Sequence, residues 1–315
     1  MIVISYICIC EQQCQSHPIK DGERCVCSPS FIIPRLIFMK KKIIASVCAL
    51  FLAVFLLWQN NSLTVSEYSF AFADLPAGFD GLKIVQLSDL HNKNFHGSLT
   101  RRVSELEPDI IVITGDLIDS RKTDYEAAIG FVDEISGIAP IYYVSGNHEQ
   151  RKDEKQEFFT ALSEHGVAVL QGETVSFKRG EDEICIAGLN DLSFYGSSVL
   201  GENKLKLQAE LDALSQKKQD SFGILLSHRP ELFDCYAESG FDIVFAGHTH
   251  GGQIRLPIIG GIFAPGQGFL PKYDAGVYEN GKTKMIISRG LGNSVFPFRV
   301  FDRPEIVVCK LERDK

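Results

Sequence analysis

Short apolar runs separated by longer amphipathic stretches make up most of the chain from Thr64 onward. Most of these runs are too uniformly apolar to have one face in water. We therefore expect strands inside a sheet that is covered on both faces. The expected strands are residues 83–87, 109–113, 141–144, 183–187, 222–226, 242–245, 284–287 and 305–311.

The stretches between the expected strands have helical spacing. Thr123 begins a capping box that is followed by apolar residues at helical intervals. A second helix is expected to open at Asp153, and residues 203–218 predict a third with a polar outer face. This alternation predicts one α/β domain over residues 64–312. Residues 256–271 are rich in Gly and Pro, which predicts a loop or hairpin near the functional site.

The N-terminal part of the chain has the order of an export signal. Met39 is followed by three lysines, and residues 43–58 are an uncharged apolar run. As a helix this run is about 24 Å long, short of a ~30 Å hydrocarbon core, so it lies between a signal peptide and a membrane anchor. No small-x-small cleavage site follows closely, which favours an uncleaved signal anchor over residues 39–60. Residues 1–38 are expected to be a non-native or disordered extension before the translation start.

The positions of the charges give the expected location and exclude one class of partner. The lysines before the apolar run predict a single-pass protein of the cell membrane, with the domain of residues 64–312 on the extracytoplasmic side. The chain has 40 Asp and Glu against 32 Lys and Arg, a net charge of −8. A nucleic-acid binder needs clustered positive charge, so we expect no nucleic-acid partner. We infer no obligate protein partner.

Five polar stretches each follow an expected strand directly: LSDLH, TGDLID, SGNHE, LSHRP and AGHTH. Loops converge at the carboxyl ends of strands in such a sheet, so these side chains are expected to meet. Asp, His and Asn without Cys suit Mn²⁺, Fe or Zn²⁺. Seven ligands are too many for one ion but suit two ions that share a carboxylate. The candidate ligands are Asp89, His91, Asp116, Asn147, His228, His248 and His250.

In this order, the five stretches resemble the signatures of calcineurin-like metallophosphoesterases: DxH, GDxxD, GNHE, H and GHxH. The resemblance implies an α/β sandwich of two mixed β-sheets flanked by helices, here with an N-terminal membrane helix. Residues 288–306, together with GHTHGGQIRLP, are similar to the membrane-anchored bacterial branch of that family. That branch includes enzymes similar to UDP-2,3-diacylglucosamine hydrolases.

The resemblance also implies a role for each site residue. Asp89, His91 and His250 are expected to bind one ion, Asn147, His228 and His248 the other, and Asp116 both. A hydroxide between the two ions is the expected nucleophile. His148 is then the general acid and Asp119 the carboxylate that orients it, although an Asp119 helix N-cap is the alternative. Arg289 and Arg299 could clamp a phosphate or form structural salt bridges.

The expected activity is hydrolysis of a phosphoester by a metal-dependent enzyme. Protein phosphatases of this superfamily carry Arg-Gly where this chain has Ser120 and Arg121, which weakens a phosphoprotein role. An anchored domain points to a phosphodiester or pyrophosphate in a lipid or envelope precursor. The alternatives are a secreted phosphatase of broad specificity and a non-catalytic metal-binding interaction module.

Overall fold

The computed structural model describes residues 29–195, 200–294 and 296–314. It contains two compact units, Met1–Phe55 and Leu56–Lys315. The described part of the first unit is helical. It belongs to α2 (Pro29–Asn61), whose last turn lies in the second unit. Most of the expected extension, residues 1–28, lies outside the described residues, and the helix already begins ten residues before Met39. The start at Met39 therefore stays a prediction.

Helix α2 is longer than the apolar run within it. Its segment Ile37–Asn61 has 25 residues and a mean hydropathy of 2.1, and is long and apolar enough to cross a membrane. A helix of this length rises about 38 Å, so the flanking residues supply the length that residues 43–58 lack. Length and composition alone do not distinguish an anchor from a signal sequence.

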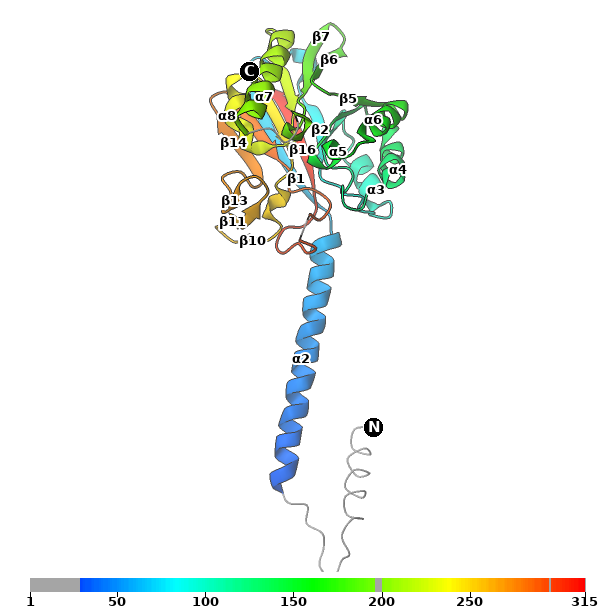
Figure 1. Cartoon of the computed structure of the whole chain (residues 1–315), viewed down its shortest axis with the longest axis vertical. Helices are drawn as coiled ribbons and strands as arrows, with labels where there is room; N and C mark the ends of the chain where they lie inside the picture. The colour runs from blue at the N-terminus through cyan, green and yellow to red at the C-terminus, as the bar shows by residue number, and fades with distance from the viewer. Residues whose placement is uncertain (1–28, 196–199, 295, 315) are drawn as a thin grey trace, which may run out of the picture. The chain divides into compact units, whose positions relative to one another are not determined.

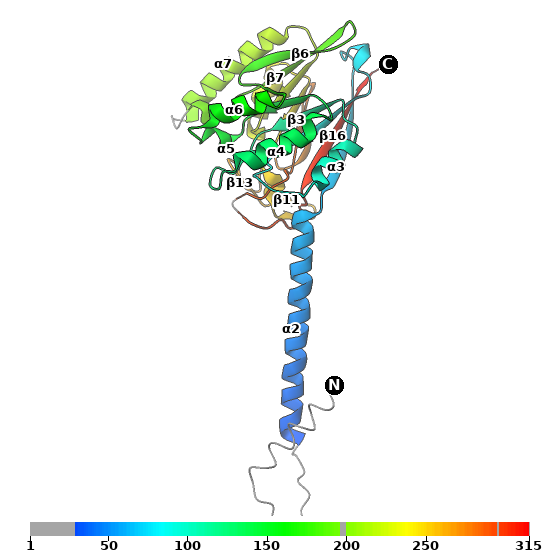
Figure 2. The ribbon, with the colours of Figure 1, turned by 90° about the vertical axis from the view of Figure 1, so that its right-hand side faces the viewer.

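Two six-stranded mixed sheets form the centre of the second unit (Figures 1 and 2). The strand order is β1-β16-β2-β3-β4-β5 in the first sheet and β14-β15-β9-β8-β7-β6 in the second. The strands of the first sheet are β1 (Thr64–Phe72), β2 (Leu82–Leu87), β3 (Ile110–Thr114), β4 (Ile141–Val144), β5 (Val167–Val169) and β16 (Glu305–Arg313). Those of the second are β6 (Glu173–Arg179), β7 (Asp182–Gly188), β8 (Gly223–Leu226), β9 (Ile243–Ala246), β14 (Gly276–Asn280) and β15 (Thr283–Ile287).

Helices cover the outer face of each sheet, which gives four layers. The first sheet packs against α3 (Ser98–Glu105), α4 (Tyr125–Ser136) and α6 (Lys155–Glu164), and the second against α7 (Leu200–Lys218) and α8 (Phe233–Glu238). Neighbouring residues of one strand point to opposite faces of the sheet. Ile84 packs between the two sheets, whereas Val85 packs against the helices. Both faces of the central strands are therefore buried. The expected sandwich of two mixed sheets flanked by helices is confirmed.

All eight expected strands are present. The helix starts differ: Asp124, not Thr123, caps α4 by accepting a hydrogen bond from Ala127 N, and α6 begins at Lys155. Residues 256–271 form two short two-stranded pairs, as the expected hairpin suggested. They are β10 (Arg255–Leu256) with β11 (Gly260–Gly261), and β12 (Phe263–Ala264) with β13 (Gly268–Phe269).

Candidate active site

The seven candidate ligands meet where the carboxyl ends of strands from both sheets come together. They follow β2, β3 and β4 of the first sheet and β8 and β9 of the second. All seven are buried, with at most 8% of any residue exposed. Gathering this many imidazoles and carboxylates away from water is unfavourable unless each has a partner. The arrangement therefore calls for a ligand that satisfies them together.

The backbone at these positions is unusual. Five of the seven candidate ligands have left-handed φ values between 48° and 71°: Asp89, His91, Asp116, His248 and His250. This conformation costs an L-residue roughly 1–2 kcal/mol and persists where the surrounding structure enforces it. Gly115 and Gly146 allow the loops after β3 and β4 to approach each other closely, because a Cβ at Gly146 would lie 2.2 Å from Asp116 Oδ1. The fold thus keeps strained loops that aim these side chains inward.

Two groups of ligand atoms converge on Asp116. In the first, His91 Nε2 lies 3.1 Å from His250 Nε2, which is 3.4 Å from Asp89 Oδ1. In the second, His228 Nε2 lies 3.1 Å from His248 Nδ1. Asp116 Oδ2 is 3.3 Å from His228 Nε2 and 3.7 Å from His91 Nε2, so it lies between the two groups.

The donor set fits divalent cations. Burial lowers the pKa of His91 to about 4 and those of His248 and His250 well below the ordinary value, so these rings are neutral ligands at pH 7. Burial also lowers the pKa of His228, but attraction to Asp116 outweighs it and raises the pKa to about 10. Positive charge is thus favoured beside Asp116. Among the described residues, the buried Asn147 Oδ1 has no hydrogen-bond partner, as a metal-ligating oxygen requires.

Comparison with protein families decides what this cluster is. The family model described as calcineurin-like phosphoesterase matches residues 82–252, a span that runs from β2 through the last histidine pair. This chain is a calcineurin-like metallophosphoesterase. It is accordingly a hydrolase with a dinuclear metal site of His and Asp groups.

Relatives of this metallophosphoesterase occur in bacteria and animals. It is 30% identical over 263 residues to the uncharacterized metallophosphoesterase YkuE of Bacillus subtilis, covering 81% of this chain and 87% of that protein. It is 32% identical over 293 residues to the uncharacterized metallophosphoesterase Cj0846 of Campylobacter jejuni, covering 90% and 72%. It is 29% identical to a transmembrane protein with metallophosphoesterase domain of Bos taurus, covering 76% of this chain and 54% of that protein. The solved structure of TT1561 of Thermus thermophilus, 13% identical, covers 67% of this chain and 90% of that chain with a TM-score of 0.47.

His148 of the metallophosphoesterase lies beside the candidate metal ligands. Its Nε2 is 3.9 Å from Asp116 Oδ2, and its ring meets that of His91 edge to face, with the ring centroids 4.5 Å apart. The Ser120 backbone N–H donates to His148 Nδ1 at 2.9 Å. Asp119 Oδ1 is 3.6 Å from the same nitrogen, and its carboxylate binds Arg121. The closest orienting group is therefore the Ser120 amide, which the sequence did not suggest.

Glu149 holds two of the loops together and was also missed. Its buried carboxylate accepts hydrogen bonds from the backbone N–H groups of Gly146, Asp116 and Ile118 at 2.8, 3.0 and 3.1 Å. It thereby fixes the Asp116 loop against the Asn147 loop. The GNHE stretch contains this residue, but nothing in the pattern distinguishes a loop-bracing carboxylate from a solvent-facing one.

A third missed residue is Arg229, which follows a candidate ligand directly. Its Nε donates to the buried Asp191 at 2.6 Å, and its Nη1 lies 3.4 Å from His248 Nε2. The guanidinium therefore supports the outer side of the His248 ring. Only the contact with Asp191, 38 residues earlier in the chain, reveals this role.

The two arginines that were candidates for a phosphate clamp form internal ion pairs. Arg289 binds Glu305 through Nε at 3.0 Å and Nη2 at 2.9 Å. Arg299 is 0% exposed; it donates to the carbonyls of Gly292 and Arg289 and pairs with Asp302. Both arginines therefore form salt bridges, and a role for either at a phosphate stays a prediction. Arg299 also lies 3.5 Å from His250 Nδ1, so it packs behind a candidate ligand.

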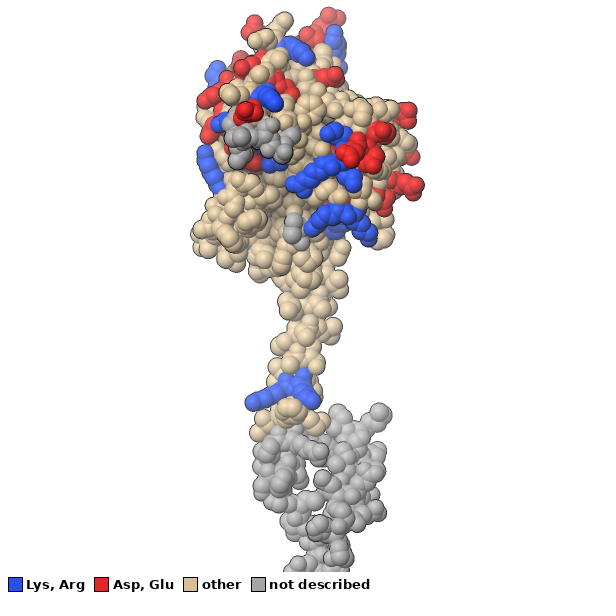
Figure 3. Space-filling model, in the orientation of Figure 1, with Lys and Arg blue, Asp and Glu red and all other residues tan. Residues whose placement is uncertain are grey.

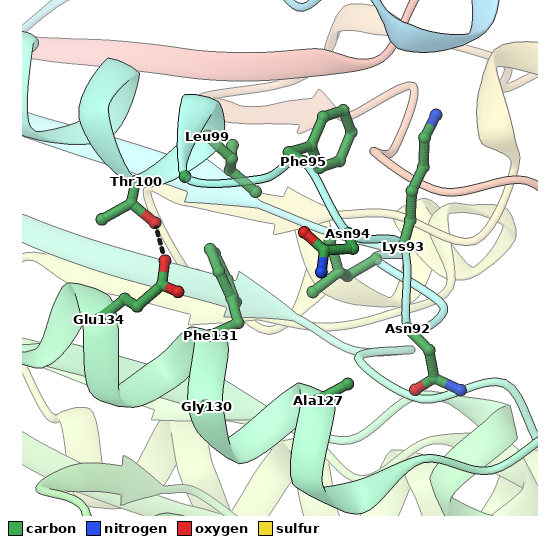
Figure 4. A pocket seen from close by; sticks show the side chains of 12 residues that line it. Asn92, Lys93, Asn94, Phe95, Leu99, Thr100, Ala127, Gly130, Phe131 and Glu134 are labelled. Carbon is green, nitrogen blue, oxygen red and sulfur yellow. Dashed lines mark hydrogen bonds between the residues drawn. The ribbon is translucent and has the colours of Figure 1, made fainter.

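A cavity of about 210 Å³ lies beside the site, on the loop that follows His91 (Figure 4). Asn92, Phe95 and Thr100 line it from one side, and Phe131 and Glu134 of α4 line it from the other. Lys93 at its edge donates a hydrogen bond to the Asn60 carbonyl at the end of α2. The last turn of that helix is therefore joined to a loop that carries a candidate metal ligand.

Proposed function

We propose that this metallophosphoesterase hydrolyses a lipid-linked or envelope phosphoester or pyrophosphate with two divalent cations, of Mn²⁺, Fe or Zn²⁺. Asp89, His91 and His250 are proposed to hold one cation, Asn147, His228 and His248 the other, and Asp116 both. The position of Asp116 Oδ2 between the two histidine groups is the observation that carries this assignment. We also place the chain, as part of the proposal, among enzymes similar to UDP-2,3-diacylglucosamine hydrolases.

When bound, the two cations would supply Lewis acidity, which makes water more acidic and neutralises charge on a phosphoryl group. The residues around them then complete the reaction. The neutral His148 ring carries its proton at Nε2, since its Nδ1 accepts from Ser120. As the proposed general acid, the ring takes up a second proton and, as the imidazolium, gives the Nε2 proton to the departing oxygen, which leaves a neutral ring. Glu149 and Arg229 keep the ligand loops and rings in place. No covalent phosphoenzyme is needed.

The proposed location follows from α2 and its flanking charge. The helix is long and apolar enough to span a bilayer, and the lysines at 40–42 favour the cytoplasm for its N-terminal side. Relatives of Bos taurus and Danio rerio are named transmembrane proteins with metallophosphoesterase domains. A substrate presented at the outer surface of the membrane suits a catalytic domain anchored there.

A metal-reconstituted assay of the full chain in detergent tests this proposal. The chain is loaded with Mn²⁺, Fe²⁺ or Zn²⁺, bound metal is counted, and hydrolysis is measured on phosphate monoesters, diesters and nucleotide-linked lipids. We expect about two ions per chain, as in two-metal phosphatases, and the highest kcat/KM on a lipid-linked substrate. One bound ion would overturn the metal assignment. Equal turnover of soluble and lipid substrates would overturn the substrate assignment.

A further inference from the structure

Two loops of the second unit expose large apolar side chains without neighbouring charges. Residues 256–271 contain no Asp, Glu, Lys or Arg, and residues 290–301 contain only Arg299, which is 0% exposed. Figure 3 shows the lower left of the domain, where β10 and β13 lie in Figure 1, as an uncharged surface. We call six of the exposed apolar side chains of these loops the apolar rim: Ile258, Ile259, Phe269, Leu270, Phe298 and Phe301.

The exposure of the rim is high for apolar residues. Ile258 is fully exposed, Phe269 is 79% exposed and Leu270 is 68% exposed. Single exposed apolar residues are ordinary, but a contiguous group rimmed by polar residues marks an interaction site. The rim therefore needs a partner that accepts apolar side chains.

The two loops form one surface because backbone hydrogen bonds join them in series. Arg255 N donates to Val300 O at 3.0 Å, which links the first loop to the second. Ile262 N then donates to Ile254 O at 3.0 Å, and Leu270 N to Ile262 O at 2.9 Å. The order Val300, Ile254, Ile262, Leu270 is thus fixed by main-chain bonds, and the rim is a built feature of the fold.

Three rim residues also have strained backbones. Ile258, Leu270 and Phe301 have φ values of 73°, 53° and 55°, in the left-handed region. A β-branched or bulky residue there is a true outlier, and such outliers cluster where function requires them. Glycine would relieve the strain at each position. Large apolar side chains at exposed, strained positions indicate that the side chains themselves have a use.

The rim is continuous with the end of α2. Arg299 N donates to Asn60 Oδ1 at 3.1 Å, and Asp302 N donates to Gln59 Oε1 at 3.3 Å, so the second loop is bound to the last turn of the helix. Trp58, in that turn, is 51% exposed, and the Arg303 guanidinium lies 5.0 Å from its ring centroid. Trp and Arg are typical of the boundary between hydrocarbon and headgroups.

From this continuity we infer that the apolar rim inserts into the headgroup region of the phospholipid bilayer that α2 enters. The inference rests on the proposed anchoring by α2 but not on the proposed reaction. Where Trp58 reaches the membrane boundary, the loop bound to its helix turn reaches it too. Interfacial segments of this kind bury apolar side chains about 5–10 Å into the boundary between headgroups and acyl chains.

Docking of the rim would bring the metal site to the lipid surface, because the second loop carries part of the rim and also contacts residues of the metal site. Gly292 N donates to the carbonyl of Asp89 at 2.6 Å, and Arg121 Nη2 donates to Ser294 O at 3.3 Å. The loop that carries Phe298 and Phe301 therefore also borders the metal site and the group around His148. Phosphoesters held in the membrane surface are the substrates that this geometry favours.

Fluorescence quenching in vesicles tests the inference without measuring activity. Trp58 is the sole tryptophan, so Trp58→Phe gives a silent background. Leu270→Trp and, separately, Ile258→Trp are added in the rim. Leu205→Trp is the matched control, since Leu205 is 73% exposed and belongs to α7, which lies at the opposite end of the second unit from β10 and β13 in Figure 1. Each full-length chain is reconstituted in phosphatidylcholine vesicles with and without bromine near the headgroup end of the acyl chains.

We expect the brominated lipid to quench both rim variants and to leave the Leu205→Trp chain at its unbrominated level. Rim tryptophans quenched no more than the control would overturn the inference.

Photolabelling of the unaltered chain provides a second measurement that needs no substitution. A lipid with a photoreactive acyl chain should label peptides from residues 256–271 and 296–303 and none from α7. Absence of rim labelling alongside labelled α2 would also overturn it, whether or not the chain hydrolyses any phosphoester.

Discussion

The Ser120 backbone N–H donates a hydrogen bond to Nδ1 of His148 at 2.9 Å. A main-chain amide can only donate, so the nitrogen that accepts from it carries no proton in the neutral ring. The proton of neutral His148 is therefore on Nε2, which faces the Asp116 carboxylate. The loop after Asp116 thus selects the tautomer of the neutral ring and directs its Nε2–H toward the candidate ligands.

Replacing His148 tests its proposed role as proton donor. His148→Ala should keep both metal ions and lose about 10²–10⁴-fold in kcat on a substrate with a poor leaving group, the range of general acid–base catalysis. The loss should shrink with 4-nitrophenolate, which leaves without protonation. The role of His148 as proton donor is tested by measuring metal content by mass spectrometry and kcat for the two leaving groups. An equal loss for both would argue against proton donation.

Asp119→Asn provides the control for that experiment. The Asp119 carboxylate is farther from His148 Nδ1 than the Ser120 amide is, and Arg121 binds it through two nitrogens. We therefore expect Asp119→Asn to reduce kcat by less than His148→Ala does. If the two variants are equally impaired, Asp119 rather than the Ser120 amide positions the histidine.

Two substitutions at the centre of the site should remove metal without touching the core. Asp116→Ala deletes the carboxylate shared by both ligand groups, and Gly146→Ala would place a methyl 2.2 Å from Asp116 Oδ1. Both should bind fewer than two ions per chain by mass spectrometry. Gly130→Ala in α4 is the matched control, because no atom lies within 4 Å of its added Cβ. It should keep its metal and gain about 0.4–1 kcal/mol in the free energy of unfolding.

The buried pair of Arg299 and Asp302 predicts a large loss of stability. Both side chains are 0% exposed, so Arg299→Ala would leave a buried carboxylate without its partner. We expect a cost of about 3–5 kcal/mol in the free energy of unfolding. Arg299→Met with Asp302→Leu should cost less than the sum of the single substitutions, as a double-mutant cycle measures. Additive effects would show that the two side chains are not coupled.

Lys93 predicts a pH dependence of stability. Burial and the positive charge of Arg299 lower the pKa of Lys93 to about 7, from 10.5 in the unfolded chain. Between these values the unfolded chain binds a proton that the folded chain has released, so stability rises with pH from about 7 to about 10. The slope is at most about 1.4 kcal/mol per pH unit.

The comparison that isolates this effect is with Lys93→Met. Thermal unfolding of both chains in the same detergent should show a difference that changes across pH 7–10, because all other groups titrate alike in both. Below pH 7 the folded and unfolded chains both carry the ammonium, and the difference should be constant. A difference that does not vary with pH would show that the Lys93 ammonium is well solvated.

The sequence predicted the strands and the site better than the helix ends and the supporting residues. Each central strand, such as Ile110–Thr114, is a run of apolar residues buried on both faces, so composition alone identifies it. The short strand Val167–Val169 and the partly exposed edge strand Glu173–Arg179 carry a weaker signal and were not expected. Local spacing placed a cap at Thr123, yet Asp124 has the side chain that reaches Ala127 N.

The seven candidate ligands were predictable because each stands directly after such a strand. Glu149, Ser120 and Arg229 were not, since their roles depend on contacts with loops distant in sequence. The groups that make these contacts are backbone N–H groups and the carboxylates of Glu149 and Asp191, and both kinds of group are common on any protein surface. Only the folded structure shows which of these residues point into the site.

The parallel pairing of β1 with β16 sets an order for biosynthesis. β1 follows α2 almost at once, but the strand beside it is translated after every other strand in both sheets. During synthesis β1 therefore stays without its neighbour in the sheet until the final segment emerges. A nascent chain that stalls before β16 lacks the strand that separates β1 from β2, and the facing edges of both strands keep unpaired backbone groups.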